Sequence, residues 1–290
     1  MTEGATREII VGYDGTQPSG EAVLWAAHEA SVRRASLQII SCYEIPTAGE
    51  AMFGWPSTQA VGELVEATEQ NLHEIRDIVV RTHPDVHLKT ITSAGPASIA
   101  LLDDLTTRDL LVVGASSHHG KAAFWLGSTP RAVIRHSPCP VVVVRGAASR
   151  GRPDRIVVGI DGSRPSEQAL RWATEEACLH QVPLVVIHGW WYPYVLAEDS
   201  RSQARDLTQV DAACVLDRAV ELARELCPGD VTGQLVETGP ASALLDAVRD
   251  GDLLVVGSRG HGAIMAGLIG STVNSVVERS AVPVVVVRAQ

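Results

Sequence analysis

The strongest chemical signal in this sequence is a glycine-rich segment in the second half of the chain. Gly257 and Gly260 directly follow the apolar run Leu253–Val256, and after nine further residues Gly-Ser-Thr at 270–272 precedes a stretch with helical character. Glycine permits φ > 0 and lets a ligand approach the backbone closely. The N–H groups of a helix N-terminus suit a phosphate, and Ser and Thr hydroxyls add donors. The spacing therefore predicts a phosphate-binding loop.

The first half carries a counterpart of this loop with a changed centre. Gly114 follows an apolar run, and Gly-Ser-Thr recurs at 127–129 with the same spacing. Ser117 stands where the second half has Gly260, and a serine also replaces Arg259. If that position requires φ > 0, serine costs about 1 kcal/mol or more in backbone strain. We expect weaker, altered or absent binding in the first half.

The same residues also fit interpretations other than a ligand loop. Isolated glycines and serines ordinarily make turns and helix caps, but their placement after a buried strand, twice in one chain, favours a ligand. Gly120-Lys121 fails as a P-loop, because the interval from Gly114 is five residues and alanine follows the lysine. His118 and His119 are adjacent and have no cysteine or carboxylate cluster, so we predict no metal site.

The two loops belong to an internal repeat. Segments Ile9–Ala30 and Ile156–Ala177 are identical at 12 of 22 aligned positions, and both halves close on the run PVVVVR. The seam falls in 146–153, a small, polar stretch with Gly and Pro that is typical of linkers. We predict one domain over 1–148 and a second over 149–290.

Each half has the element pattern βαβαβαβαβ. Runs such as LLVV and VVVV lack polar alternation, which indicates strands buried on both faces in a parallel sheet. With right-handed crossovers, the fold class is α/β, as two tandem Rossmann-like, doubly wound, five-stranded sandwich domains. Such sheets bind ligands at the carboxyl ends of strands where the strand order reverses. We therefore expect the first and fourth βα loops of each half to form the site.

An aspartate ends the first strand of each half, Asp14 and Asp161. With the loop spacing Gly-x2-Gly-x9-Gly-Ser/Thr, this combination resembles the universal stress protein family, once per half and over essentially the whole chain, as in tandem actinobacterial members. The resemblance implies ATP as the ligand, with or without Mg²⁺. It also implies that adenosine lies between the ends of the first two strands and that the phosphates lie on the glycine-rich loop.

Carried over by position, the resemblance implies nucleotide contacts in both halves. Asp161 would accept a hydrogen bond from the adenosine part, and Gly189 would lie beside the adenine. The other positions implied in the second half are Gly159, Ser163, Val256, Gly257, Arg259, Gly260, Gly270, Ser271 and Thr272. Those implied in the first half are Gly12, Asp14, Thr16, Tyr43, Val113, Gly114, Ser117, Gly127, Ser128 and Thr129, with Tyr43 at the adenine position.

Composition limits the partners and the compartment. A net charge of −10 repels phosphate backbones and acidic membrane faces, so we expect no nucleic-acid or membrane binding. The five cysteines are odd in number and form no C-x-x-C, which argues against a disulfide framework and for a reducing interior. No apolar run approaches the ~20 residues of a membrane helix, and the first residues do not resemble a signal peptide. We expect a cytoplasmic protein.

We interpret the chain as a nucleotide-responsive regulator of the stress response and not as an enzyme, because no general base, carboxylate pair or nucleophile elbow accompanies the loop. Slow incidental ATP hydrolysis is left open. So are two alternatives, an interaction protein that needs no nucleotide and a binder of another adenine nucleotide such as cyclic AMP. The aromatic cluster at 190–194 predicts packing over the core edge, or else a lid or a partner surface. Val-rich closing strands predict an intrachain pseudo-dimer and a further homodimer. A protein partner is expected but its identity is unknown.

Overall fold

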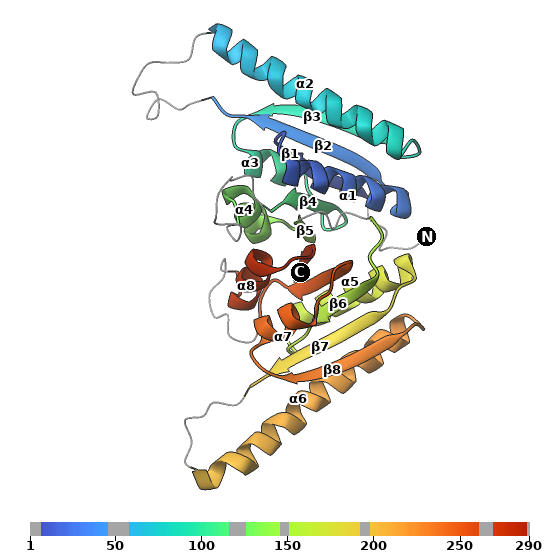
Figure 1. Ribbon diagram of the computed structural model, residues 1–290, viewed down its shortest axis with the longest axis vertical. Helices are drawn as coiled ribbons and strands as arrows, with labels where there is room; N and C mark the ends of the chain where they lie inside the picture. The colour runs from blue at the N-terminus through green and yellow to red at the C-terminus, as the bar shows by residue number, and fades with distance from the viewer. Residues whose placement is uncertain are drawn as a thin grey trace. The chain divides into compact units, whose positions relative to one another are not determined.

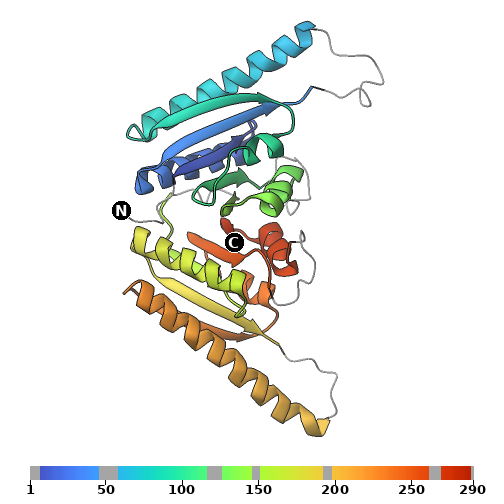
Figure 2. The same cartoon turned by 180° about the vertical axis from the view of Figure 1, so that it is seen from behind.

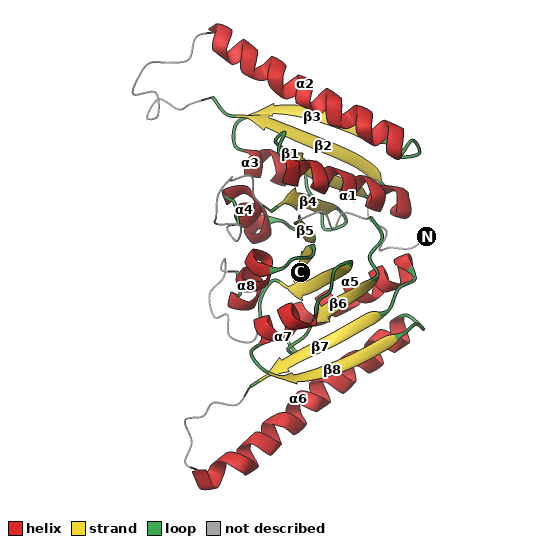
Figure 3. Cartoon of the chain, in the orientation of Figure 1, coloured by secondary structure: helices red, strands yellow, loops and turns green. Residues whose placement is uncertain are grey.

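The computed structural model describes residues 7–45, 58–115, 126–145, 151–191, 198–260 and 269–288, and of residues 198–207 only the backbone. It divides into two units, 1–151 and 152–290. Helices and strands alternate through both units (Figure 3). The predicted boundary between residues 148 and 149 lies outside the described residues.

The first unit is a five-stranded parallel sheet with helices on both faces. Its strand order is β3-β2-β1-β4-β5, and α1 packs with α2 while α3 packs with α4 (Figure 1). The elements are β1 (Glu8–Tyr13), α1 (Gln17–Arg33), β2 (Ser36–Tyr43), α2 (Thr58–Thr82), β3 (Leu88–Ala94), α3 (Ala97–Leu102), β4 (Leu110–Gly114), α4 (Ser128–His136) and β5 (Val141–Val144).

The second unit repeats this architecture with the strand order β8-β7-β6-β9-β10. Helix α5 packs with α6, and α7 packs with α8; in the view from behind, α5 and α6 run along their sheet (Figure 2). The elements are β6 (Arg155–Gly159), α5 (Arg164–His180), β7 (Leu184–Trp190), α6 (Glu198–Leu226), β8 (Val231–Glu237), α7 (Pro240–Ala247), β9 (Asp252–Gly257), α8 (Ser271–Arg279) and β10 (Val284–Val287).

The strands form as the apolar runs predict. Every residue of β5 and β10 is buried, and so are Leu110–Val113 of β4, because helices cover both faces of each sheet. The strand order reverses between β1 and β4 and between β6 and β9, so the doubly wound α/β prediction is confirmed. Among the described helices, none has the length and apolar character needed to cross a membrane.

A buried ion pair aligns the two central strands of the second unit. Arg155, the first residue of β6, donates from Nε to Oδ1 of Asp252 over 2.7 Å and from Nη2 to its Oδ2 over 2.8 Å. Asp252 opens β9 and also accepts the backbone N–H of Arg249 at 2.7 Å. The hydrogen bond to Asp252 raises the pKa of Arg155, against the opposing effect of burial. This pair anchors the amino ends of the strands whose carboxyl ends form the site.

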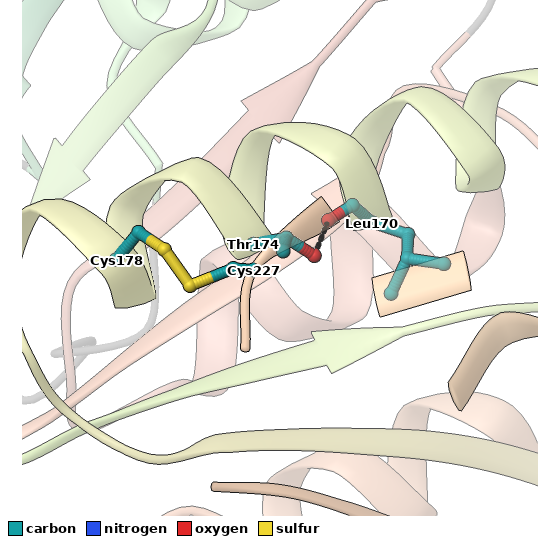
Figure 4. The surroundings of a disulfide bond; sticks show 4 residues. All are labelled: Leu170, Thr174, Cys178 and Cys227. Carbon is teal, nitrogen blue, oxygen red and sulfur yellow. Dashed lines mark hydrogen bonds between the residues drawn. A yellow bond between two sulfur atoms is a disulfide. The ribbon is translucent and has the colours of Figure 1, made fainter. Parts of the chain in front are cut away.

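The cysteines depart from expectation. Cys178 of α5 and Cys227, just beyond α6, form a disulfide with Cα atoms 6.2 Å apart (Figure 4). The prediction against disulfides is therefore wrong for this pair. Sequence spacing could not reveal it, because the two residues are 49 positions apart and only the packing of α5 with α6 brings them together. Cys42, Cys139 and Cys214 are free thiols.

Candidate functional site

A cavity of about 760 Å³ lies at the carboxyl ends of β6, β7 and β9 in the second unit. This volume is within the range of roughly 300–1,000 Å³ that is typical of small-molecule sites. Ten residues predicted from the sequence line it: Gly159, Asp161, Gly189, Val256, Gly257, Arg259, Gly260, Gly270, Ser271 and Thr272. Ser163 is not among the lining residues. It contacts Asp161 and Ser166 in the loop after β6.

The loop after β6 holds Asp161 in a fixed position. Gly162 turns the chain with φ +78°, a conformation that glycine adopts without strain. The backbone N–H of Ser163 then donates to Oδ1 of Asp161 over 3.0 Å, and the N–H of Asp161 donates to Oγ of Ser166 over 3.3 Å. Ser163 also caps α5, where its Oγ accepts the N–H of Ser166. One carboxylate oxygen of Asp161 is thus hydrogen-bonded within the turn.

The other carboxylate oxygen of Asp161 explains Gly260. A Cβ atom on Gly260 would overlap Oδ2 of Asp161. The backbone of Gly260 does not lie in the left-handed region, so the glycine is needed for close approach and not for φ > 0. Gly257 has a similar role, since its Cβ would come within 2.7 Å of the carbonyl oxygen of Pro165. In the second unit this position therefore does not require φ > 0, the condition on which the strain expected for serine depended, and Ser117 itself lies outside the described residues.

The N-terminus of α8 forms the opposite wall of the predicted phosphate site. Gly270 is the N-cap residue and α8 has no side-chain cap hydrogen bond, so Ser271 is not the simple helix cap considered from the sequence. The N–H of Gly270 donates to the carbonyl oxygen of Ser258 over 3.2 Å, which ties the two ends of the glycine-rich loop together. First-turn N–H groups and the hydroxyls of Ser271 and Thr272 are suited to an anion.

Several lining residues were missed by sequence reasoning, and three of them lie on or just after β7. His188 donates from Nδ1 to the carbonyl oxygen of Ile160 over 2.7 Å, because a carbonyl can only accept. Trp191 is 60% exposed and borders the cavity, while Ile187 and Leu244 add apolar surface. An apolar wall with few polar groups suits a flat heterocyclic base.

The first unit has a smaller cavity, of about 280 Å³, at the corresponding place. The predicted residues that line it are Gly12, Asp14, Thr16, Val113, Gly114, Gly127, Ser128 and Thr129. Asp14 is bound as in the second unit, with its Oδ1 accepting the N–H of Thr16 over 3.1 Å. Ser117, like His118 and His119, lies outside the described residues.

The adenine position of the first unit was misassigned by one residue. Leu37 and Leu184 occupy equivalent positions, since they pair with Ile9 and Ile156 of the repeat. Five residues further along β2 the equivalent of Gly189 is Cys42, which lines the cavity, whereas Tyr43 does not. The prediction for Tyr43 is therefore wrong.

Two carboxylates, Asp14 and Glu44, are among the described residues that line this smaller cavity. Glu44 lines it at the position that Trp191 occupies in the second unit. Burial and then the Glu44 carboxylate raise the pKa of Cys42. Burial, followed by the carboxylates of Glu74 and Asp14, raises the pKa of Tyr13, another lining residue. The carboxylates are the smaller cause of both shifts, and the Glu44 carboxylate at the cavity wall would repel a phosphate.

Comparison with known proteins agrees with the repeat and the fold. The model of the universal stress protein family matches residues 5–145 and again 153–288. A universal stress protein of Mycolicibacterium smegmatis is 28% identical over 99% of both chains. One of Mycobacterium tuberculosis is 29% identical over 97% of this chain and 96% of its own. The crystal structure of a universal stress protein from Archaeoglobus fulgidus superposes with a TM-score of 0.71 at 19% identity, covering 98% of this chain and 99% of that one. The chain therefore belongs to the universal stress protein family, as a tandem member with two family units.

Proposed function

We propose that this chain is a nucleotide-responsive regulator whose second unit binds one molecule of ATP, while the first unit binds none. The observation that carries the proposal is that one cavity of about 760 Å³ is lined by the Asp161 carboxylate, an apolar wall and the uncapped N-terminus of α8. These are the three kinds of group that a ribose, a base and a phosphate chain require.

The residues suggest one orientation of the nucleotide. Ribose hydroxyls would donate to Asp161, whose carboxylate can only accept. The base would lie against Ile187, Gly189 and Trp191, and the phosphates would lie between Arg259 and the first turn of α8. Asp161 is the one carboxylate among the described lining residues, so an accompanying Mg²⁺ would be held mainly by phosphate oxygens and water.

Binding without rapid turnover fits this set of groups. The described lining residues offer a single carboxylate, and it already accepts the N–H of Ser163. A second carboxylate to hold a catalytic metal is therefore lacking among them. We expect ATP to act by stabilising the second unit and changing the surface that a protein partner meets.

We expect the first unit to bind no nucleotide. Its cavity is about 280 Å³, just below the usual range for ligand sites, and Glu44 adds a negative charge where Trp191 stands in the second unit. A phosphate chain would have to enter against the added charge of Glu44.

The direct test is to denature purified protein, identify released nucleotides by mass spectrometry, and then measure thermal stabilisation by ATP, ADP, GTP and cyclic AMP. We expect bound ATP or a clear rise in the melting temperature with ATP. If cyclic AMP alone stabilises the protein, the ligand is cyclic AMP and not ATP. No bound nucleotide and no stabilisation would contradict the proposal and favour an interaction protein that needs no nucleotide.

A further inference from the structure

The disulfide of the second unit joins the end of α5 to the residue that follows α6. Cys178 lies in the last turn of α5, and Cys227 follows α6 directly. The chain between them includes all of β7 and α6, and therefore Ile187, His188 and Gly189 of the candidate site. Closing this loop covalently removes conformational freedom from the unfolded segment. The bridge thus acts on the segment that bears one wall of the cavity.

The two cysteine residues of the bridge differ in exposure. Cys178 is exposed, whereas Cys227 is 8% exposed. A cavity of about 450 Å³ lies beside the bridge and is lined by both cysteines together with Thr174, Val182 and Pro228. The cavity beside the bridge gives an external thiol room to approach it. Thiol–disulfide exchange requires this kind of access to one sulfur.

The first unit has no such bridge, which makes it an internal reference. Ser31 occupies the position of Cys178, because the repeat aligns Ala30 with Ala177. His83 directly follows α2 as Cys227 directly follows α6, and their N–H groups donate to the equivalent carbonyl oxygens of Val79 and Ala223, so His83 stands at the position of Cys227. The same helix-on-helix packing thus occurs once with a thiol pair and once without.

We infer that Cys178 and Cys227 form a redox-reversible latch of the second unit, closed by a peroxide and opened by a low-molecular-weight thiol. In closing, the Cys178 sulfur attacks hydrogen peroxide to give a sulfenic acid and water, and the Cys227 sulfur displaces a second water to form the S–S bond. In opening, an external thiolate attacks the Cys178 sulfur and Cys227 leaves as a thiolate that takes up a proton. A second external thiol then releases Cys178 and departs as the external disulfide.

The latch predicts a stability difference confined to one unit. Closing it should raise the melting temperature of the second unit by about 5–15 °C, given typical disulfide stabilisation in a domain of this size. Hydrogen exchange in β7 and in the C-terminal part of α6 should slow on oxidation. The corresponding segments of the first unit, β2 and α2, should exchange at the same rate in both states.

The experiment equilibrates the native full-length protein in glutathione buffers of graded redox ratio, quenches with N-ethylmaleimide under denaturing conditions, and measures intact mass. The expected transition is from five adducts to three, since five cysteines are present and two join the bridge. Peroxide treatment of the reduced protein should give the same Cys178–Cys227 peptide. Cys178→Ser, which copies Ser31, should abolish the redox dependence of melting, and Cys214→Ser, at an exposed free thiol of α6, should preserve it.

Three results would overturn the inference. The pair could remain as thiols in oxidised glutathione and peroxide, or stay bridged in reduced glutathione, or close without any change in melting and exchange. If Cys178→Ser does not fold, the oxidised and reduced wild-type protein still decide the question, because hydrogen exchange compares the same polypeptide in two states.

Discussion

The backbone of Gly260 lies so close to Oδ2 of Asp161 that a Cβ atom at residue 260 would overlap the carboxylate. Asp161 cannot move away freely, because its Oδ1 accepts the N–H of Ser163 over 3.0 Å. The end of β6 and the loop after β9 therefore fit together only when residue 260 lacks a side chain. This contact joins the proposed ribose-binding carboxylate to the proposed phosphate loop.

Gly260→Ala should weaken ATP binding by about 10- to 100-fold, or about 1.4–2.8 kcal/mol, because it displaces Asp161 or the loop. Calorimetric titration with ATP measures the effect. Gly239→Ala is the matched control, since a Cβ there meets no atom within 4 Å, and it should leave affinity unchanged. Equal affinities of the Gly260→Ala variant and the wild type would show that the contact has no part in binding.

Trp191→Glu transfers the charge of Glu44 to the second unit and should lower ATP affinity more at low salt than at high salt, because added salt screens an exposed carboxylate. Trp191 is 60% exposed, so the fold should tolerate the change. Trp191→Gln separates the loss of the ring from the gain of charge. A salt response shared by both variants would argue against the electrostatic explanation.

Arg155→Ala should destabilise the second unit by about 3–5 kcal/mol, because it leaves the Asp252 carboxylate, 2% exposed, without its ionic partner. Chemical denaturation followed by hydrogen exchange assigns the loss to this unit. Arg171→Ala breaks an exposed pair with Glu167, in which both side chains are about half exposed, and should cost under ~0.5 kcal/mol. Similar losses in the two variants would contradict a specific role for the buried pair.

The three free thiols should react with iodoacetamide in a defined order at pH 8. Cys214 is exposed and should react first. Burial and Glu44 raise the pKa of Cys42, and burial raises the pKa of Cys139 to about 11, so both stay largely protonated and Cys139 should react last. Peptide mass spectrometry over time measures the order. Early labelling of Cys139 in the folded protein would refute it.

Most of the fold could be predicted from the sequence, because the signals for strands and for the repeat are local. Val-rich runs predict buried parallel strands, and the repeat predicts that both units share one topology. The phosphate side of the site was also predictable, since Gly257, Gly260 and Gly270 follow one strand in order. On β7 only Gly189 was predicted, and His188 and Trp191 were missed because whether their side chains face the cavity depends on contacts with distant segments. Tyr43 was misassigned because a shift of one residue turns a side chain to the other face.

The most direct test of the account is the number of ATP molecules bound per chain, measured by calorimetry on the full-length protein and on two equivalent variants. Asp161→Ala and Asp14→Ala remove the same carboxylate from the two units, and each aspartate makes the same turn contact. The account predicts one site in the wild type, an unchanged site in Asp14→Ala, and an affinity at least about tenfold weaker in Asp161→Ala. Two sites per chain, or a site lost in Asp14→Ala and kept in Asp161→Ala, would contradict it.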